Sequence, residues 1–215
     1  MLMNSARERI LARLQAQQPD RSTSERLTQR LQQPPLGPLP PGAQVEDLVT
    51  RFTEQALALS STLEPLPDLA AVPAAVARYL QQHALPSRAI CWPQWQGLDW
   101  TGSGLWVEAR PAHGDDLVGI TGCFCAIAET GTLLLTSGSK TPAASSLLPE
   151  THIAIVPRQR LLPHMEAAWT LLREEQGQLP RACNFVSGPS RTGDIEQTIT
   201  LGAHGPYRVH ILLVG

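Results

Sequence analysis

Lysine is nearly missing from this chain, because Lys140 is its only lysine and every other basic residue is an arginine. Codon usage in a GC-rich genome explains this bias at least as well as selection for the planar guanidinium group of arginine does. A dominant charge is also missing, since 17 basic residues face 19 acidic ones and leave a net charge of -2. Such a balance gives no overall field that would attract nucleic acid or an anionic membrane surface, so we expect neither as a partner.

Long hydrophobic runs are absent too. No apolar stretch approaches the roughly twenty residues needed to span a bilayer. The opening residues, MLMNSARERI, lack the hydrophobic segment of a signal peptide, so the expected location is cytoplasmic. With 215 residues and 42% hydrophobic content, the chain can bury one good core, which predicts one domain with an appendage.

Cysteine is scarce, with only Cys91, Cys123, Cys125 and Cys183. Nothing marks the chain as secreted, so free thiols are expected. The C-x-C spacing would place two sulfurs on one face of a strand, but no nearby histidine or cysteine pair completes a zinc site. Iron-sulfur spacing is absent as well. We interpret the four cysteines as small buried hydrophobic residues and expect no metal site.

The first 42 residues differ from the rest. Ser5 with Glu8 and Ser22 with Glu25 both have the spacing of a helix-capping box. Thin apolar stripes follow these caps and predict two short helices in a docking arm: Ile10, Leu11 and Leu14, then Leu27 and Leu31.

A stiff connector ends this arm. In PPLGPLPPG, residues 34–42, five of the nine residues are prolines, which fix φ and remove amide donors. Beyond the connector, apolar residues at helical spacing predict an amphipathic helix over 46–60 that packs on the domain. The expected organisation is therefore an arm with its linker, residues 1–42, and one domain, residues 43–215.

The domain alternates strand and helix signals. A helix is expected from Asp68 to His83, with Pro73 near its first turn. After Pro157, an apolar stripe predicts a further helix: Leu161, Met165, Ala168 and Leu172. Short apolar runs are typical of strands: 88–92, 105–109, 117–121, 132–136, 152–156, 183–187 and 209–214. This alternation favours an α/β fold of three layers, a mainly parallel sheet with helices on both faces.

One cluster of chemically useful side chains lies in AIAETGTLLLTSG, residues 126–138. Glu129 stands at the entrance to an apolar strand beside the hydroxyls of Thr130 and Thr132, and Gly131 frees the backbone. A carboxylate held at a strand end is suited to act as a nucleophile or base if burial raises its pKa. The alternative is a glutamate that only caps local amides in a turn, and both interpretations stay open.

A denser polar cluster is SGPSRTGDIE, residues 187–196, which GAHGP follows at 202–206. Loops of this kind at strand ends are where α/β proteins keep their sites. The candidate binding residues are Ser187, Gly188, Pro189, Ser190, Arg191, Thr192, Glu196 and Gly205, with Gly202 and Pro206 shaping the backbone.

The polar groups of this cluster suggest anion binding. Arg191 could clamp a carboxylate or phosphate through two parallel hydrogen bonds, with Asp194 and Glu196 orienting it. Alternatively, an Arg-Asp pair only braces the loop. His204 is either a general acid/base or a partner of a neighbouring carbonyl in a tight turn.

Familiar catalytic motifs do not fit. The run from Gly188 to Thr192 lacks the final glycine of a nucleophile elbow. Gly102 and Gly104 lack the third glycine of a dinucleotide fingerprint. The four tryptophans between 92 and 106 either edge a pocket or partner surface, or form a half-buried packing cluster.

The segments GITG, AIAETGTLLL, SLLPETHIAIVP and SGPSRTGDIEQTITLGAHGPYRVHILLV together resemble the LUD-domain family, closest to its lactate utilization protein C branch. The similarity runs from about Leu117 to Gly215, and SGPSRT-x-DIE with G-x-HGP is its most specific part. The resemblance implies a NagB/RpiA/CoA-transferase-like fold and a role in converting L-lactate to pyruvate as one of three proteins encoded together. It also implies two partners, an iron-sulfur protein and a CCG-type cysteine-rich protein. This chain lacks their cysteines, so no cofactor is expected in it and the iron-sulfur clusters are expected on the partners.

Three functions follow as hypotheses. The first is a non-redox component of an L-lactate utilization system that holds a small carboxylate or other anionic ligand between the 129–132 and 187–206 loops, with Glu129, His204 and Asp194 as catalytic candidates. The second is a stand-alone enzyme transferring an acyl group, CoA or a phosphoryl group with Glu129 as nucleophile, by fold-level analogy with CoA transferases. The third is a scaffold subunit without its own chemistry.

Overall fold

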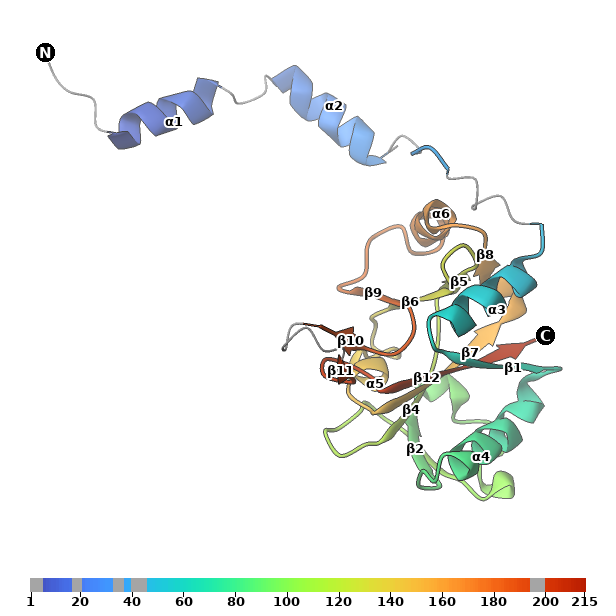
Figure 1. Cartoon of the computed structure of the whole chain (residues 1–215). Coiled ribbons are helices and arrows are strands. Elements are labelled where there is room, and N and C mark those ends of the chain that lie inside the picture. The colour runs from blue at the N-terminus through green and yellow to red at the C-terminus, as the bar shows by residue number, and fades with distance from the viewer. Residues whose placement is uncertain (1–5, 17–20, 33–36, 40–45, 194–199) are drawn as a thin grey trace, which may run out of the picture. The chain divides into compact units, whose positions relative to one another are not determined.

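The computed structural model describes residues 6–16, 21–32, 37–39, 46–193 and 200–215. The chain forms two compact units, residues 1–38 and 39–215, which are described separately (Figure 1).

The first unit contains the two short helices that the apolar stripes predict, α1 (Ala6–Ala16) and α2 (Arg21–Gln32). Ser22 lies inside α2, so its prediction as the cap is wrong, while Ser5 and most of the connector lie outside the described residues. The stripes are exposed to solvent at Ile10, Leu11, Leu14 and Leu27. Within the described residues, no helix combines the length and apolar character needed to cross a membrane.

The second unit is built on a six-stranded sheet in which every neighbouring pair is parallel. In spatial order its strands are β1 (Thr62–Leu66), β12 (Arg208–Val214), β7 (Thr151–Pro157), β4 (Val118–Gly122), β2 (Arg88–Cys91) and β3 (Trp106–Ala109). The central strands are continuous apolar runs because both of their faces are covered.

Helices cover both faces of this sheet, which confirms the predicted three-layer α/β class. The helices are α3 (Leu48–Ala58), α4 (Val72–Gln82) and α5 (Ala144–Leu147). Tyr79 of α4 stacks on His210 of β12 with 4.0 Å between ring centroids. On the other face, Gly119 of β4 lies against the backbone of Ser145 in α5. Figure 1 shows α3 and α4 on opposite sides of the sheet.

A second sheet of four strands, which the sequence analysis did not separate from the first, joins this framework. Its strands are β8 (Leu161–Leu162), β5 (Cys125–Ile127), β6 (Thr132–Thr136) and β9 (Cys183–Val186), and α6 (Met165–Gln176) packs on β5 and β8. The β5–β6 and β6–β9 pairs are antiparallel. The short strands β10 (Arg191–Thr192) and β11 (Thr200–Leu201) pair with each other as a separate antiparallel sheet.

Polar caps fix where the helices begin. Asp47 accepts hydrogen bonds from the backbone amides of Val49 and Thr50 and so starts α3. Asp68 caps a 3-10 turn that leads into α4, with Pro73 in the first turn as predicted. The short 3-10 turns are Leu69–Ala71, Pro93–Trp95, Thr101–Ser103 and Arg158–Arg160.

Three of the clustered tryptophans belong to the core. Trp92, Trp95 and Trp100 are buried, whereas Trp106 on the edge strand β3 is 66% exposed. The packing interpretation therefore holds for Trp95 and Trp100, while the buried Trp92 also lines a pocket.

The cysteines are all free thiols. Burial raises the pKa of Cys91 to about 11 and that of Cys125 to about 12, which keeps both neutral. Cys123 precedes β5 rather than lying in it, so the expectation of two sulfurs on one strand face is wrong.

Candidate functional site

The two loops predicted to form a site meet through a chain of hydroxyl groups. Thr132, the first residue of β6, lies with its Oγ1 2.8 Å from Oγ1 of Thr130 and 2.8 Å from Oγ of Ser187. Ser187 directly follows β9, the antiparallel neighbour of β6. The pairing of these strands therefore places the turn before β6 beside the loop after β9.

The C-terminal end of α3 lies against both loops. Gly131 has φ +63 and contacts the backbone of Ala56, and Gly188 has φ +81 and contacts the carbonyl of Leu59. A Cβ at either glycine would lie closer than 3.0 Å to that backbone. Glycine is required at both positions because the backbone turns left-handed and approaches the helix closely.

Arg191 binds the end of α3. Its Nη2 donates to the backbone carbonyl of Leu59 at 3.4 Å and to the hydroxyl of Ser60. A cation beside the last carbonyls of a helix is electrostatically favourable. The arginine predicted to clamp an anion thus makes a structural contact here, although the residue as a whole is exposed.

The second half of the motif is held by backbone hydrogen bonds. The amide of Ser190 donates to the carbonyl of Pro206, and the amide of Gly202 donates to the carbonyl of Ser190, both at 2.9 Å. Gly205 lies close to the Ser190 side chain. The GAHGP segment is therefore the scaffold of the 187–193 loop.

Not every candidate joins this cluster. The amide of Glu129 donates to the carbonyl of Pro163 at 3.0 Å, and its half-buried side chain makes no ion pair with Arg191 within the part of the chain that the structure describes. His204 is exposed. Asp194 and Glu196, predicted to orient Arg191, lie outside the described residues, while Pro189 and Thr192 are buried.

Comparison with known proteins identifies the family. The model of the LUD domain matches residues 107–214, which include both loops. The chain belongs to the LUD domain family. The structure also resembles the crystal structure of a DUF162 family protein from Deinococcus radiodurans, with a TM-score of 0.57 and 21% identity over 78% of this chain and 96% of that one.

Curated relatives of this LUD domain carry the name lactate utilization protein C. The Bacillus subtilis protein is 38% identical over 100 residues, which cover 45% of this chain and 42% of that protein. Lactate utilization protein C 1 of Bacillus mycoides is 39% identical over 100 residues, covering 45% of this chain and 43% of the relative. The matched region is thus less than half the length of these relatives.

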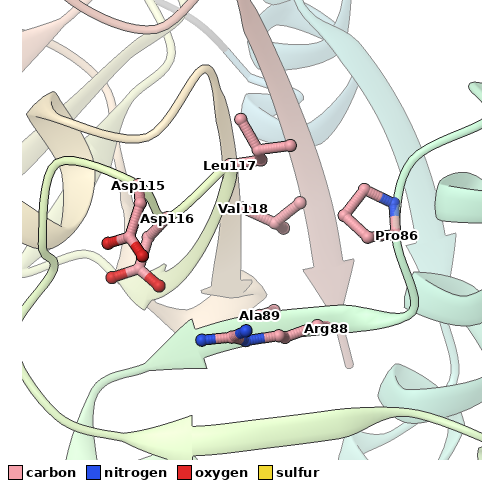
Figure 2. Close-up of a pocket in the computed structure, with 7 residues that line it drawn as sticks. All are labelled: Pro86, Arg88, Ala89, Asp115, Asp116, Leu117 and Val118. Carbon is pink, nitrogen blue, oxygen red and sulfur yellow. The ribbon is translucent and has the colours of Figure 1, made fainter.

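A pocket of about 200 Å³ lies at the amino ends of β2 and β4 in this LUD domain, between Arg88 and the adjacent residues Asp115 and Asp116 (Figure 2). Its lining includes charged side chains of both signs, one arginine and two aspartates. Ligands of parallel α/β sheets bind at the opposite, carboxyl edge, so its position does not favour a functional site.

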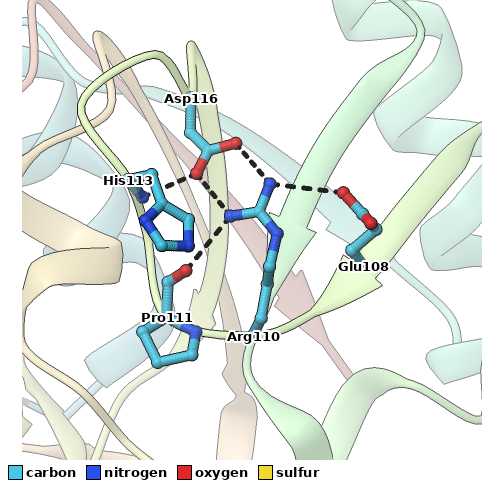
Figure 3. Close-up of polar contacts among 5 residues, drawn as sticks. All are labelled: Glu108, Arg110, Pro111, His113 and Asp116. Atoms are coloured by element: carbon cyan, nitrogen blue, oxygen red, sulfur yellow. Dashed lines mark hydrogen bonds and ion pairs between the residues drawn. The ribbon is translucent and has the colours of Figure 1, made fainter.

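Asp116 is the centre of a hydrogen-bond network in the loop between β3 and β4. Its carboxylate accepts two hydrogen bonds from Arg110, at 2.6 and 2.8 Å, and one from the amide of His113 (Figure 3). These bonds, that of Arg110 foremost, hold the pKa of Asp116 below its ordinary value. Arg110 Nη2 also lies 3.2 Å from Oε2 of Glu108, so the charge of Arg110 is paired with acidic groups in and beside this loop.

Two buried histidines in the central strands are polar groups that the sequence analysis did not mention. His152 Nε2 lies 2.7 Å from the Thr121 hydroxyl, and His210 Nδ1 lies 2.8 Å from the Thr62 hydroxyl. The second ring nitrogen of each has no hydrogen-bond partner among the described residues. Burial lowers the pKa of both imidazoles to about 4, so both are neutral near pH 7.

A pocket at the carboxyl edge of the sheet was also missed. It lies beside Trp92, the last residue of the predicted strand 88–92, and Cys123, two residues after the predicted strand 117–121. The predicted ends of these two strands could have indicated the pocket, because ligands in such sheets bind just beyond the ends of neighbouring strands. Arg160, also in its wall, gave no sequence signal because its contribution depends on how the chain returns after β7.

Proposed function

We propose that this LUD domain is a non-redox component of an L-lactate utilization system and that it holds a small anionic ligand between the 129–132 and 187–206 loops. The observation that carries the proposal is its similarity to proteins named lactate utilization protein C, in a family whose matched region, 107–214, contains both loops.

The geometry of the loops supports ligand binding. Thr130, Thr132 and Ser187 form a continuous row of hydroxyls. Two of their three protons are used within the row, which leaves one hydroxyl able to donate to an oxyanion. Glu129 precedes Thr130 in the β5–β6 turn, and its half-buried carboxylate is the group that would accept a proton from a bound hydroxy acid. The close approach of Gly131 and Gly188 to the end of α3 fixes the 129–132 turn and the start of the second loop against this helix.

Electron transfer belongs to other proteins in this proposal. The four cysteines of the chain do not have iron-sulfur spacing. An iron-sulfur protein and a CCG-type cysteine-rich protein would carry the clusters that oxidise lactate.

Glu129→Gln tests this function. The change keeps the side-chain shape and removes the carboxylate. A deletion strain complemented with this variant is expected to grow on pyruvate but not on L-lactate, while the purified variant keeps the wild-type melting temperature. Glu174→Gln, which removes an exposed carboxylate from α6, is the matched control and should restore growth on both carbon sources.

Normal growth of the Glu129→Gln strain on L-lactate would contradict the proposed role of this site. An acyl adduct trapped on Glu129 after incubation with CoA thioesters would instead favour the stand-alone transfer enzyme. Arg191→Ala is a less direct probe, because it also removes the contacts with Leu59 and Ser60 at the end of α3.

A further inference from the structure

A second pocket, of about 170 Å³, lies at the carboxyl edge of the parallel sheet. Trp92 and Gln94 follow β2, and Cys123 and Phe124 follow the neighbouring strand β4. Arg160 closes one side from the 3-10 turn after β7. Segments that follow three adjacent strands of the sheet therefore line this pocket, together with Thr136 of β6 and Thr141.

The pocket lies where the chain direction diverges. From β2 the chain continues to β3, at the outer edge of the sheet, whereas the next strand of this sheet after β4 is β7, on the opposite side. Neighbouring strands whose connections diverge leave a crevice at their carboxyl ends, and open α/β sheets bind ligands in that crevice. The topology thus favours a ligand between β2 and β4.

Arg160 is the charged group of this pocket. Both carboxylate oxygens of Glu175 contact the same nitrogen, Nη1, at 2.8 and 2.9 Å. Nε and Nη2 make no hydrogen bond with the described residues, and the guanidinium lies 5.7 Å from the centre of the Phe124 ring. Unused guanidinium donors beside an aromatic wall suit a carboxylate that carries a short apolar chain.

The remaining walls are neutral and fixed in place. The Trp92 indole donates to the carbonyl of Pro142 at 3.4 Å, and the Thr141 hydroxyl donates to the carbonyl of Thr136 at 2.8 Å. The amide of Gln94 contacts Gly122, where a Cβ would lie 2.8 Å from its Nε2. Burial raises the pKa of the Cys123 thiol, so this group contributes an uncharged surface.

No carboxylate of the described residues lines the pocket itself. With a volume of about 170 Å³, the pocket is smaller than the roughly 300–1,000 Å³ pockets that hold drug-sized ligands, which suits a molecule of few non-hydrogen atoms. We propose that it binds a small monocarboxylic acid, with the carboxylate on Arg160 and the short chain against Trp92 and Phe124.

This site is distinct from the one discussed above. The register of the β5–β6 hairpin pairs Cys125 with Leu134 near the pocket and Ile127 with Thr132 near the Glu129 turn. The two sites therefore lie at opposite ends of one hairpin, and the second proposal does not rest on the first.

Titration of the ¹⁵N-labelled full chain tests the proposal through the indole resonance of Trp92, assigned with Trp92→Phe. L-lactate and propionate should shift this resonance saturably at about millimolar concentration, which is usual for ligands of this size. Uncharged L-lactamide should cause no saturable shift.

Two substitutions that break the same ion pair separate binding from a structural role. Arg160→Gln should weaken L-lactate binding at least about tenfold, because it removes the cation. Glu175→Gln should tighten binding about two- to fivefold, because it removes the carboxylate that competes for Arg160. Arg173→Gln, on the exposed side of α6, is the matched control and should leave the dissociation constant within about twofold.

Equal affinity of Arg160→Gln and the wild-type protein would overturn the proposal, as would an equal response to L-lactamide or stronger binding of inorganic phosphate. A change of the same sign in Arg160→Gln and Glu175→Gln would show that the pair only holds the fold. Because this measurement uses purified protein, failure of the Glu129→Gln growth test and failure of this titration are independent results.

Discussion

At the scale of single residues, His152 and His210 make stability depend on pH. Each has an ordinary pKa of 6.5 when exposed and about 4 in the folded chain, so the unfolded state binds more protons between these values. The neutral imidazoles stabilise the fold fully above pH 6.5, and this contribution is lost as the pH falls toward 4. His83, close to His210, lowers the pKa of His210 further when charged.

We expect the free energy of unfolding to fall by about 3 kcal/mol for each of these histidines between pH 7 and pH 4. Urea denaturation across this range measures the slope. His152→Gln and His210→Gln should each reduce the pH-dependent difference by about that amount, whatever they do to stability at pH 7. A slope that both variants leave unchanged would contradict burial of the neutral rings as its cause.

The adjacent acids Asp115 and Asp116 provide a matched comparison. Asp116 is buried and accepts three hydrogen bonds, two of them from Arg110, whereas Asp115 is exposed. Asp116→Asn should lower the free energy of unfolding by about 2 kcal/mol, because the buried charge pair with Arg110 is broken. Asp115→Asn should change it by less than about 0.5 kcal/mol. Equal effects of the two substitutions in chemical denaturation would show that the hydrogen bonds of Asp116 add no stability beyond the effect of its negative charge.

At the scale of elements, the end of α3 is the part on which both loops of the first site depend. Gly131 and Gly188 are needed at this contact for conformation and for space, while Gly177 at the end of α6 has φ +67 with nothing within 4 Å of a Cβ. The three glycines therefore separate the cost of a left-handed backbone from the cost of a clash.

Gly177→Ala is expected to lower the free energy of unfolding by about 1 kcal/mol, the cost of a left-handed conformation alone. Gly131→Ala and Gly188→Ala should each cost about 3 kcal/mol or more, because α3 must also move away. Thermal unfolding of the three variants measures the difference. If all three lose the same stability, the packing of the loops on α3 is not tight.

The elements that the sequence predicts well are those with long apolar runs. The strands near 88, 118, 152 and 209 and the helices near 46 and 68 all form close to their expected bounds. The strands β5, β8, β10 and β11 have only two or three residues each, too short for a periodic signal. Leu161 was wrongly placed in a helix because its spacing from Met165 fits one, whereas pairing with β5 decides its conformation.

At the scale of the whole molecule, the unit of residues 39–215 has a core of its own. Among the described residues, that core runs from Phe52 to Val214. Within the first unit, Ile10, Leu11 and Leu14 of α1 and Leu27 of α2 are exposed, so these residues form no buried core there.

A fragment of residues 39–215 should therefore unfold cooperatively, with a melting temperature within about 3 °C of that of the full chain. Calorimetry on both proteins makes the comparison. A loss of more than about 10 °C would mean that the arm packs on the domain and contributes to its stability.

The sequence predicts the composition of the first site better than its contacts. The meeting of Thr132 and Ser187 follows from two strands that were both predicted, but their antiparallel pairing in a separate sheet was not. Arg191 was expected to face an anion, yet the carbonyl of Leu59 lies within its reach because Gly188 lets α3 approach. Contacts of this kind depend on tertiary packing, which no local pattern encodes.

The position of β12 in the main sheet has a consequence for the order of folding. This strand, almost the last segment of the chain, lies between β7 and β1, and β1 pairs with no other strand of the sheet. During synthesis on the ribosome, β1 must therefore wait about 140 residues for its neighbour, while β2, β4 and β7 can already associate. The nascent chain would keep this edge of β7 unpaired until β12 has left the ribosome, and an unpaired strand edge is prone to aggregation.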